Sequence, residues 1–446
     1  MGQEKSAVFY RQTTHELPVI VRADGCYLWD GSGHKVLDLA SGISTTASIG
    51  QGRREIAAAM AAQAEQLAFI HNSWVTNERQ EELARRYALL APEGVNQVMF
   101  TSGGSEANEL SLRLARQYHL ARDEPQRYKV ISVAPSYHGA TMGALSMTGR
   151  WDINAEYEPY LFSGHRVPAP VLYRGSFQDL EPKEAGLRAA DTLADAIEAA
   201  GPDTVAAFIG EPISPSAGTV VPDQVYWQRI REICDHYGVL LIADEVVTGA
   251  GRTGHFVAMD HFGIIADLSN LGKGLTGGYA PVAATLIRDT VAETIREAGR
   301  GVSTVHTYAG NPIGCAVAAA VLDVIESENL IQRSRELGSH AMAMLEEHIG
   351  DLPPVGAIRG LGLLIGIEYV QSREGRERFP VSADVGRSLW DAMWRKGFLL
   401  RTLRHSTSLV GDSTNFVPAL TITEEQITSG VTALRDTLLE VAPGWM

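Results

Sequence analysis

The chain has 446 residues, of which 45% are hydrophobic and 20% are charged, so it can bury a large core in more than one lobe. Its formal net charge of −15 excludes the basic surface that nucleic acid or an anionic membrane requires, and small molecules are the expected ligands. Cys26, Cys234 and Cys315 are widely spaced and form no C-x-x-C pair, so neither disulfides nor a metal site is expected. The absence of a signal-like or membrane-spanning apolar segment predicts a cytoplasmic protein.

The predicted elements alternate between strands and helices over roughly the first two thirds of the chain. Apolar runs predict strands at residues 97–100, 129–134, 205–210, 239–243 and 266–271. One helix is expected after Gly104, and another begins at Asp223 as its N-cap and ends at Gly238. This alternation is typical of a parallel sheet covered by helices. Beyond Asn311 the pattern changes to two long helices, at residues 313–326 and about 332–348.

Two of the predicted strands deliver a charged residue to their carboxyl ends. The strand at 239–243 leads into Asp244, and the strand at 266–271 leads through Gly272 to Lys273. In open α/β sheets this edge is where ligands bind. An aspartate that can face a pyridine nitrogen and a lysine that can form an imine are the two groups that pyridoxal phosphate chemistry requires.

A glycine-rich turn offers a place for the phosphate of such a cofactor. Residues 103–105, Gly-Gly-Ser, follow a predicted strand and open a helix, whose first backbone N–H groups and dipole attract an anion. The nucleotide-binding alternatives fail on spacing: Lys273 is followed by glycine instead of the serine or threonine of a P-loop, and the 103–108 turn is not G-x-G-x-x-G.

Seven motifs follow one another in the order seen in the class III pyridoxal-phosphate-dependent aminotransferases, which the chain resembles from about Gly25 to Ile427. They are Gly103-Gly-Ser-Glu-Ala107, Tyr137-His-Gly139, Gly210-Glu-Pro-Ile213, the run from Ala243 to Gly254, Gly272-Lys-Gly274, His306-Thr-Tyr308 with Asn311-Pro312, and Arg359-Gly-Leu-Gly362. The resemblance implies an α/β fold of fold type I. A large cofactor domain with a mostly parallel sheet flanked by helices would span residues 60–310, and a smaller α+β domain would combine residues 1–59 and 311–446.

The resemblance also implies pyridoxal 5'-phosphate as the cofactor and assigns residues to it. Lys273 would hold the cofactor as a Schiff base and transfer protons, and Asp244 would face the pyridine nitrogen. The other implied cofactor contacts are Gly104 and Ser105 at the phosphate, Tyr137 with His138 on one ring face, Val246 on the other face, Glu211, and Thr307 at the phosphate of a neighbouring subunit. A homodimer or larger homo-oligomer is therefore expected. Val247 replaces the glutamine that many members use at the ring hydroxyl.

Substrate choice depends on a few positions. In the 4-aminobutyrate and ornithine branches the residue matching Glu211 pairs with an arginine. That arginine position is Asn415 here, which disfavours those branches.

The chain is more similar to the ω-amino acid and amine:pyruvate transaminases at residues 49–56, 222–237 and 399–401. There Arg401 is the candidate for the acceptor carboxylate, with Arg404 as its competitor and a plain surface arginine as the alternative for both. Ser44 or Thr45 stands where those enzymes usually have a tryptophan, which predicts a roomier or more polar pocket. Tyr137 is expected to be a further substrate contact.

The function implied is transfer of an amino group from an ω-amino acid or primary amine to a keto acid, pyruvate by preference, in a ping-pong reaction through Lys273. The alternatives are a fold-sharing decarboxylase of the dialkylglycine type and an amino-acid racemase. A cofactor-binding protein without catalysis would require loss of the lysine or the aspartate, and both are present.

Overall fold

A computed structural model describes residues 6–10, 17–162, 164–299, 301–303, 306–403 and 411–445. Its largest sheet has seven strands in the order β4-β10-β9-β8-β7-β5-β6. Their bounds are β4 (Gln97–Thr101), β5 (Lys129–Ala134), β6 (His165–Pro168), β7 (Val205–Gly210), β8 (Leu240–Glu245), β9 (Leu268–Leu271) and β10 (Ala283–Ile287). Strands β5 to β9 pair in parallel, whereas β10 is antiparallel to β9 and β4. The mostly parallel sheet and its five predicted strands are confirmed, and β6 and β10 are additions.

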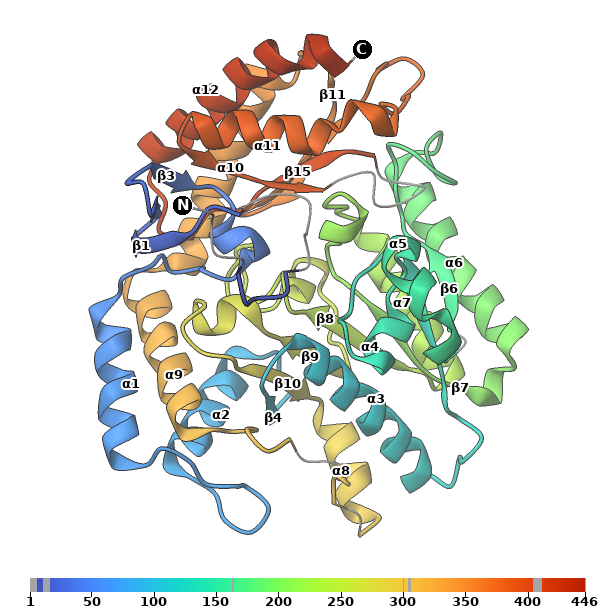
Figure 1. Cartoon of the computed structure of the whole chain (residues 1–446). Helices are drawn as coiled ribbons and strands as arrows, with labels where there is room; N and C mark the ends of the chain where they lie inside the picture. The colour runs from blue at the N-terminus through green and yellow to red at the C-terminus, as the bar shows by residue number, and fades with distance from the viewer. Residues whose placement is uncertain are drawn as a thin grey trace.

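Helices cover both faces of this sheet because successive strand residues point to opposite sides (Figure 1). On one face Ile209 and Ile242 pack with residues of α3 (Gly104–Ala121) and α8 (Asp289–Glu297). On the other face Phe208 and Leu241 pack with α6 (Pro182–Ala200) and α7 (Gln224–Tyr237). The strands are therefore buried on both sides, as their nearly uninterrupted apolar sequences predict.

The ends of α7 follow the capping chemistry in the sequence. The Asp223 side chain accepts a hydrogen bond from the Val225 N–H at the start, and Gly238 takes a left-handed conformation (φ 66°) at the end. Both predicted helix boundaries are confirmed.

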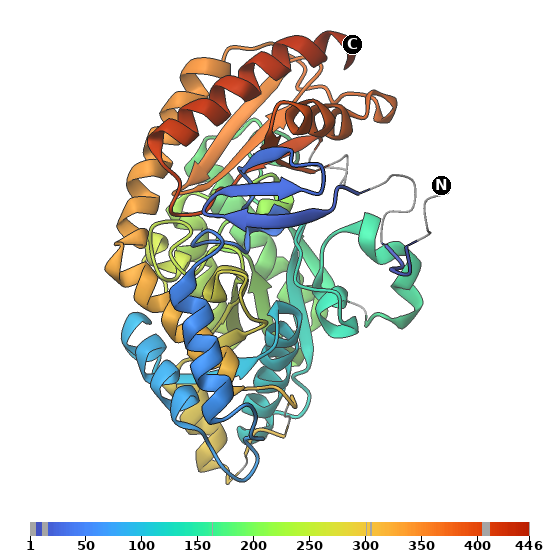
Figure 2. The same cartoon turned by 60° about the vertical axis from the view of Figure 1, so that its left-hand side comes forward.

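Two smaller sheets lie above the large one in Figure 1. One has the order β1 (Ile20–Asp24), β2 (Tyr27–Asp30), β3 (Lys35–Asp38), β13 (Phe398–Leu399), and the other β11 (Val355–Leu361), β12 (Leu364–Tyr369), β15 (Ser413–Phe416), β14 (Arg401–Leu403). Because β13 pairs with β3, segments from both ends of the chain share a sheet. Figure 2 shows these N-terminal strands next to the C-terminal elements. The domain boundaries near residues 60 and 310 stay a prediction.

The remaining helices complete the layers around these sheets. They are α1 (Arg54–Gln66), α2 (Glu78–Leu90), α4 (Met142–Met147), α5 (Trp151–Asn154), α9 (Pro312–Ser327), α10 (Leu330–Ile349), α11 (Val385–Arg395) and α12 (Glu424–Val441). Helices α9 and α10 confirm the two long helices expected beyond Asn311. Within the described ranges, none of the helices combines the length and apolar character needed to cross a membrane.

Candidate active site

The carboxyl ends of β8 and β9 bring the two charged residues of the sequence analysis to one edge of the sheet. Asp244 lies opposite Asn270 in the parallel register of these strands, and β9 continues through Gly272 into Lys273. Lys273 has a left-handed backbone (φ 44°) at the start of a 3-10 turn, a conformation that is costly for a side chain other than glycine and is concentrated at functional sites. Burial lowers the pKa of the Lys273 ammonium, and the nearby Asp244 carboxylate opposes that effect.

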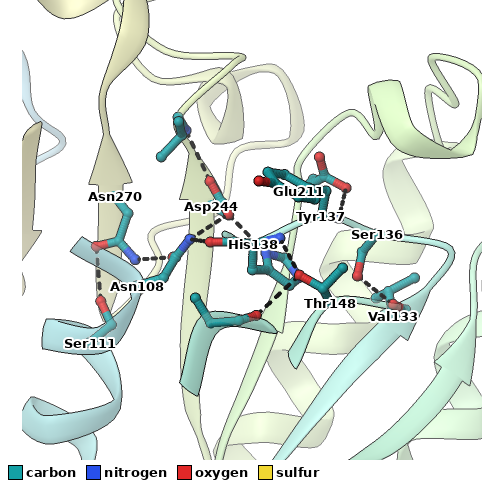
Figure 3. A network of polar contacts seen from close by, with 12 residues as sticks. Asn108, Ser111, Val133, Ser136, Tyr137, His138, Thr148, Glu211, Asp244 and Asn270 are labelled. Atoms are coloured by element: carbon teal, nitrogen blue, oxygen red, sulfur yellow. Dashed lines mark hydrogen bonds and ion pairs between the residues drawn. The ribbon is translucent and has the colours of Figure 1, made fainter. Parts of the chain in front are cut away.

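Asp244 is nearly buried and accepts three hydrogen bonds. Its Oδ2 accepts from Asn108 Nδ2 and from His138 Nδ1, each at 2.8 Å, and its Oδ1 accepts from the Val246 N–H at 3.1 Å (Figure 3). The His138 ring is itself buried, and its backbone N–H donates to Thr148 Oγ1 at 2.9 Å. Hydrogen bonds of this kind stabilise the charged form of a carboxylate.

The N-terminus of α3 forms a tight cradle beside this carboxylate. A Cβ on Gly104 would lie 2.8 Å from Val246 Cγ1, and a Cβ on Gly139 (φ 144°) would lie 2.5 Å from Ser105 Oγ. Ser105 Oγ also accepts from the Ala140 N–H at 3.1 Å. Glycine is therefore required at both positions, and the structure brings Gly104, Ser105 and Val246 together beside the strand ends. Such a helix start, rich in free N–H groups, suits a phosphate.

Tyr137 and Glu211 form the opposite side of the site. The Glu211 carboxylate accepts from Ser214 Oγ at 2.7 Å and from the Tyr137 N–H at 3.4 Å, and the Tyr137 side chain is partly exposed. Figure 3 shows Tyr137 beside Glu211 and near Asp244. Burial raises the pKa of Glu211 to about 7, and the Asp244 carboxylate adds to the rise.

The two positions considered for substrate selection lie opposite each other on neighbouring strands. Arg401 of β14 pairs with Asn415 of β15. Asn415 is fully buried and donates from Nδ2 to Thr219 Oγ1 at 2.8 Å, so it belongs to the core. The charge of Arg401, by contrast, lowers the pKa of Lys273, which places this guanidinium within electrostatic reach of the site. Arg404 lies outside the described residues.

Other expected residues have less defined surroundings. Thr307 is exposed and follows His306, whose Nδ1 lies 3.8 Å from Glu106 Oε2 on α3; its contact with a neighbouring subunit stays a prediction. Ser44 is exposed, and its hydroxyl lies 2.9 Å from Thr46 Oγ1, whereas Thr45 is buried. Val247 packs against a small apolar cluster of Ile213, Leu364 and Val417.

Sequence reasoning missed a set of buried polar residues behind Asp244. Asn108 and Ser111 lie on the sheet-facing side of α3, Asn270 interrupts the apolar strand β9, and Thr285 lies on β10. All four are at most 1% exposed. The sequence did contain a signal for this set, because these polar residues stand at positions whose spacing predicts burial. Buried polar groups require hydrogen-bond partners, so such residues are expected to contact one another.

The arrangement combines a buried amine, a carboxylate that accepts three hydrogen bonds and an anion cradle, which are the groups that hold and activate a phosphorylated pyridine aldehyde. Within the part of the chain that the structure describes, no group of three or more histidine, cysteine, aspartate or glutamate side chains could hold a metal ion.

Comparisons with known proteins agree on one family. The family model described as "Aminotransferase class-III" matches residues 8–438. The chain is 34% identical to the putrescine–pyruvate aminotransferase of Pseudomonas aeruginosa over 95% of this chain and 91% of that protein. It is also 34% identical to the diaminobutyrate–2-oxoglutarate transaminase of Halomonas elongata, over 92% of this chain and 87% of that protein. A solved (S)-enantioselective ω-transaminase from Thermomicrobium roseum has 35% identity and a TM-score of 0.90, covering 95% and 93% of the two chains.

Proposed function

Because this chain belongs to the class III aminotransferase family, we propose that it transfers an amino group from an ω-amino acid or primary amine to pyruvate, with pyridoxal 5'-phosphate as cofactor. Family membership confirms the resemblance seen in the sequence, the fold type I architecture and the assignment as an enzyme acting on small amino and keto compounds. A homodimer or larger homo-oligomer is part of the proposal, and sedimentation equilibrium would measure it.

The convergence of Lys273, Asp244 and the α3 cradle carries the proposal. When bound, the cofactor supplies an aldehyde that takes up the donor's amino group and a ring that accepts the electron pair released at the donor's α carbon. The Asp244 carboxylate would hold a proton on the pyridine nitrogen through charge attraction. Gly104 and Ser105 would bind the phosphate, and Tyr137 and Val246 would orient the ring from its two faces.

Lys273 would act as the acid and base of the reaction. Burial lowers the pKa of its ammonium, so a larger share of its Nζ is the neutral amine that can accept a proton. Nζ would move the proton between the α carbon of the donor and the carbon that carries the cofactor's aldehyde. Asp244 limits the fall in pKa, so that the same nitrogen can also donate.

Arg401 supports a monocarboxylate acceptor. A guanidinium binds one carboxylate through two parallel hydrogen bonds. The nearby Arg150 is already engaged by Asp152, with Nε–Oδ1 and Nη2–Oδ2 distances of 3.1 and 2.6 Å, and the Asn415 position offers no positive charge. The second carboxylate of 2-oxoglutarate would therefore lose water without gaining a charged partner. The two relatives above differ in acceptor by name, so similarity alone does not choose between pyruvate and 2-oxoglutarate.

The test follows the two half-reactions separately by the visible absorbance of the holoprotein. A panel of ω-amino acids and primary amines should bleach the aldehyde band, and pyruvate should restore it faster than 2-oxoglutarate. Arg401→Ala should slow the restoration by pyruvate roughly tenfold or more, the loss of about one charged hydrogen-bonded pair, and leave bleaching by a primary amine that has no carboxylate nearly unchanged. Arg401→Lys is the matched control, because it keeps the charge but loses the bidentate contact.

Four outcomes would contradict parts of this proposal. Release of carbon dioxide from the donor would indicate a decarboxylase, and inversion of an amino acid without amino transfer would indicate a racemase. A clear preference for 2-oxoglutarate, or unchanged pyruvate reactivity in Arg401→Ala, would refute the acceptor assignment and leave amino transfer standing.

A further inference from the structure

A chain of side-chain hydrogen bonds leads from the core of the large sheet to Asp244 (Figure 3). Ser111 Oγ and Thr285 Oγ1 donate to Asn270 Oδ1 at 2.9 and 2.7 Å. Asn270 Nδ2 donates to Asn108 Oδ1 at 2.7 Å, and Asn108 Nδ2 donates to Asp244 Oδ2 at 2.8 Å. The chain joins three separate elements, α3, β9 and β10, to the end of β8.

The direction of every bond in this chain follows from the chemistry of its members. An ionised carboxylate only accepts hydrogen bonds, so Asn108 must present its NH₂ group to Asp244 and its carbonyl oxygen to Asn270. Asn270 must then present its own NH₂ group to Asn108, which leaves its oxygen for the two hydroxyl donors. Neither amide can turn over without placing two oxygens against each other in a dry interior.

The same amide also fixes the histidine that contacts Asp244. Asn108 Nδ2 donates a second bond, of 2.6 Å, to the backbone oxygen of His138, whose Nδ1 is the other donor to Asp244 Oδ2. Two donors thus occupy Oδ2, so Oδ1, which accepts from the Val246 N–H, has acceptor capacity left.

We infer that Asn270 and Asn108 are positioning residues that form a directional amide relay, which orients the Asp244 carboxylate toward the cofactor's pyridine nitrogen and stabilises its charge. At the other end of the relay, outside the binding site, the Ser111 and Thr285 hydroxyls satisfy the oxygen of Asn270. This inference rests on the proposed function, because it takes pyridoxal phosphate as the group that Asp244 faces.

The relay is tested by titrating the apoprotein with pyridoxal phosphate across a pH series. Asn270→Leu keeps the size of the side chain and removes all three of its side-chain hydrogen bonds, so cofactor affinity should fall about tenfold at every pH. Asn270→Asp can replace the amide donor only when its new carboxyl is protonated. Its affinity should approach that of the parent at low pH and fall further below it as the pH rises, since the ionised form would force Asn108 to turn its oxygen toward Asp244.

The pH at which the visible band of the bound cofactor changes provides a second readout and should differ from the parent in both variants. Thr285→Ser keeps the hydroxyl donor and should behave as the parent, whereas the double variant Ser111→Ala/Thr285→Val, which serves if Asn270→Leu does not fold, should weaken cofactor binding.

The outcomes separate the relay from the function on which it rests. Affinities within twofold of the parent for Asn270→Leu, or a constant loss for Asn270→Asp at all pH values, would overturn the relay while the parent still binds the cofactor. If the parent protein itself fails to bind pyridoxal phosphate, the proposed function is what fails.

Discussion

Glu211 is an acidic side chain of the site with a raised pKa. Its pKa is raised to about 7 by burial, and its position near Arg401 means that its ionised form attracts the same guanidinium that we assign to the acceptor. The folded chain holds the proton of this carboxyl more tightly than the unfolded chain does. The contribution of Glu211 to the free energy of unfolding therefore decreases as the pH rises from about 4.5 to about 7.

The KM for pyruvate should therefore rise as the pH passes through about 7. Between about pH 6 and about pH 8 the newly ionised Glu211 competes with pyruvate for Arg401 and repels its carboxylate, which should raise the KM roughly threefold or more. In Glu211→Gln this rise should be absent. Steady-state kinetics with saturating donor would measure it.

Glu245 offers a matched control for this prediction. Burial also raises its pKa to about 7, but its carboxylate accepts from Thr248 Oγ1 and from the Met259 N–H, and the charge that acts on it is that of Asp260. Glu245→Gln should keep the pH dependence of the KM. A rise that persists in Glu211→Gln would show that another group controls acceptor binding.

At the scale of elements, the start of α3 determines how closely the phosphate cradle packs against β8. Gly104→Ala would place a Cβ 2.8 Å from Val246 Cγ1, and overpacking of this kind costs about 1–3 kcal/mol. Affinity for pyridoxal phosphate should fall about tenfold, because either the helix start or Val246 must move. Fluorescence titration of the apoprotein would give the dissociation constant.

Gly103→Ala is the control within the same turn. A Cβ there meets no atom within 4 Å, and its φ of −172° is open to any residue. Its cofactor affinity should stay close to that of the parent. Equal losses in the two variants would mean that the close approach to Val246 does not shape the site.

The elements that the sequence predicted are those with local signals. Helix α7 has an aspartate cap and a terminal glycine, and β7 and β8 are apolar runs, so their existence follows from neighbouring residues. Strand β10 lies between β9 and β4 and pairs antiparallel with both, a position fixed by partners far away in the chain. The Asn108–Asn270 pair was hidden for the same reason, since it forms only when α3 packs on β9.

For the whole molecule, the resemblance to a family supplied what local patterns could not. Strand ends and a glycine-rich turn indicated Lys273, Asp244 and the start of α3, the family motifs gave each of them a role, and the structure places them at one sheet edge. The position of Arg401 depends on β14, a strand of three residues paired with β15, and no periodicity in the sequence indicates so short an element. The whole-chain arrangement also brings segments near both ends of the chain into one small sheet, through the pairing of β3 with β13.

Covalent trapping tests the central claim most directly, because it asks whether this edge of the sheet holds the cofactor through Lys273. Borohydride reduction of the holoprotein followed by peptide mapping should find the cofactor on Lys273 and on no other lysine. Lys273→Ala should still bind pyridoxal phosphate but lose turnover by several orders of magnitude, as expected when a covalent catalyst is removed. A label on a different lysine, or near-parental turnover in Lys273→Ala, would contradict the account.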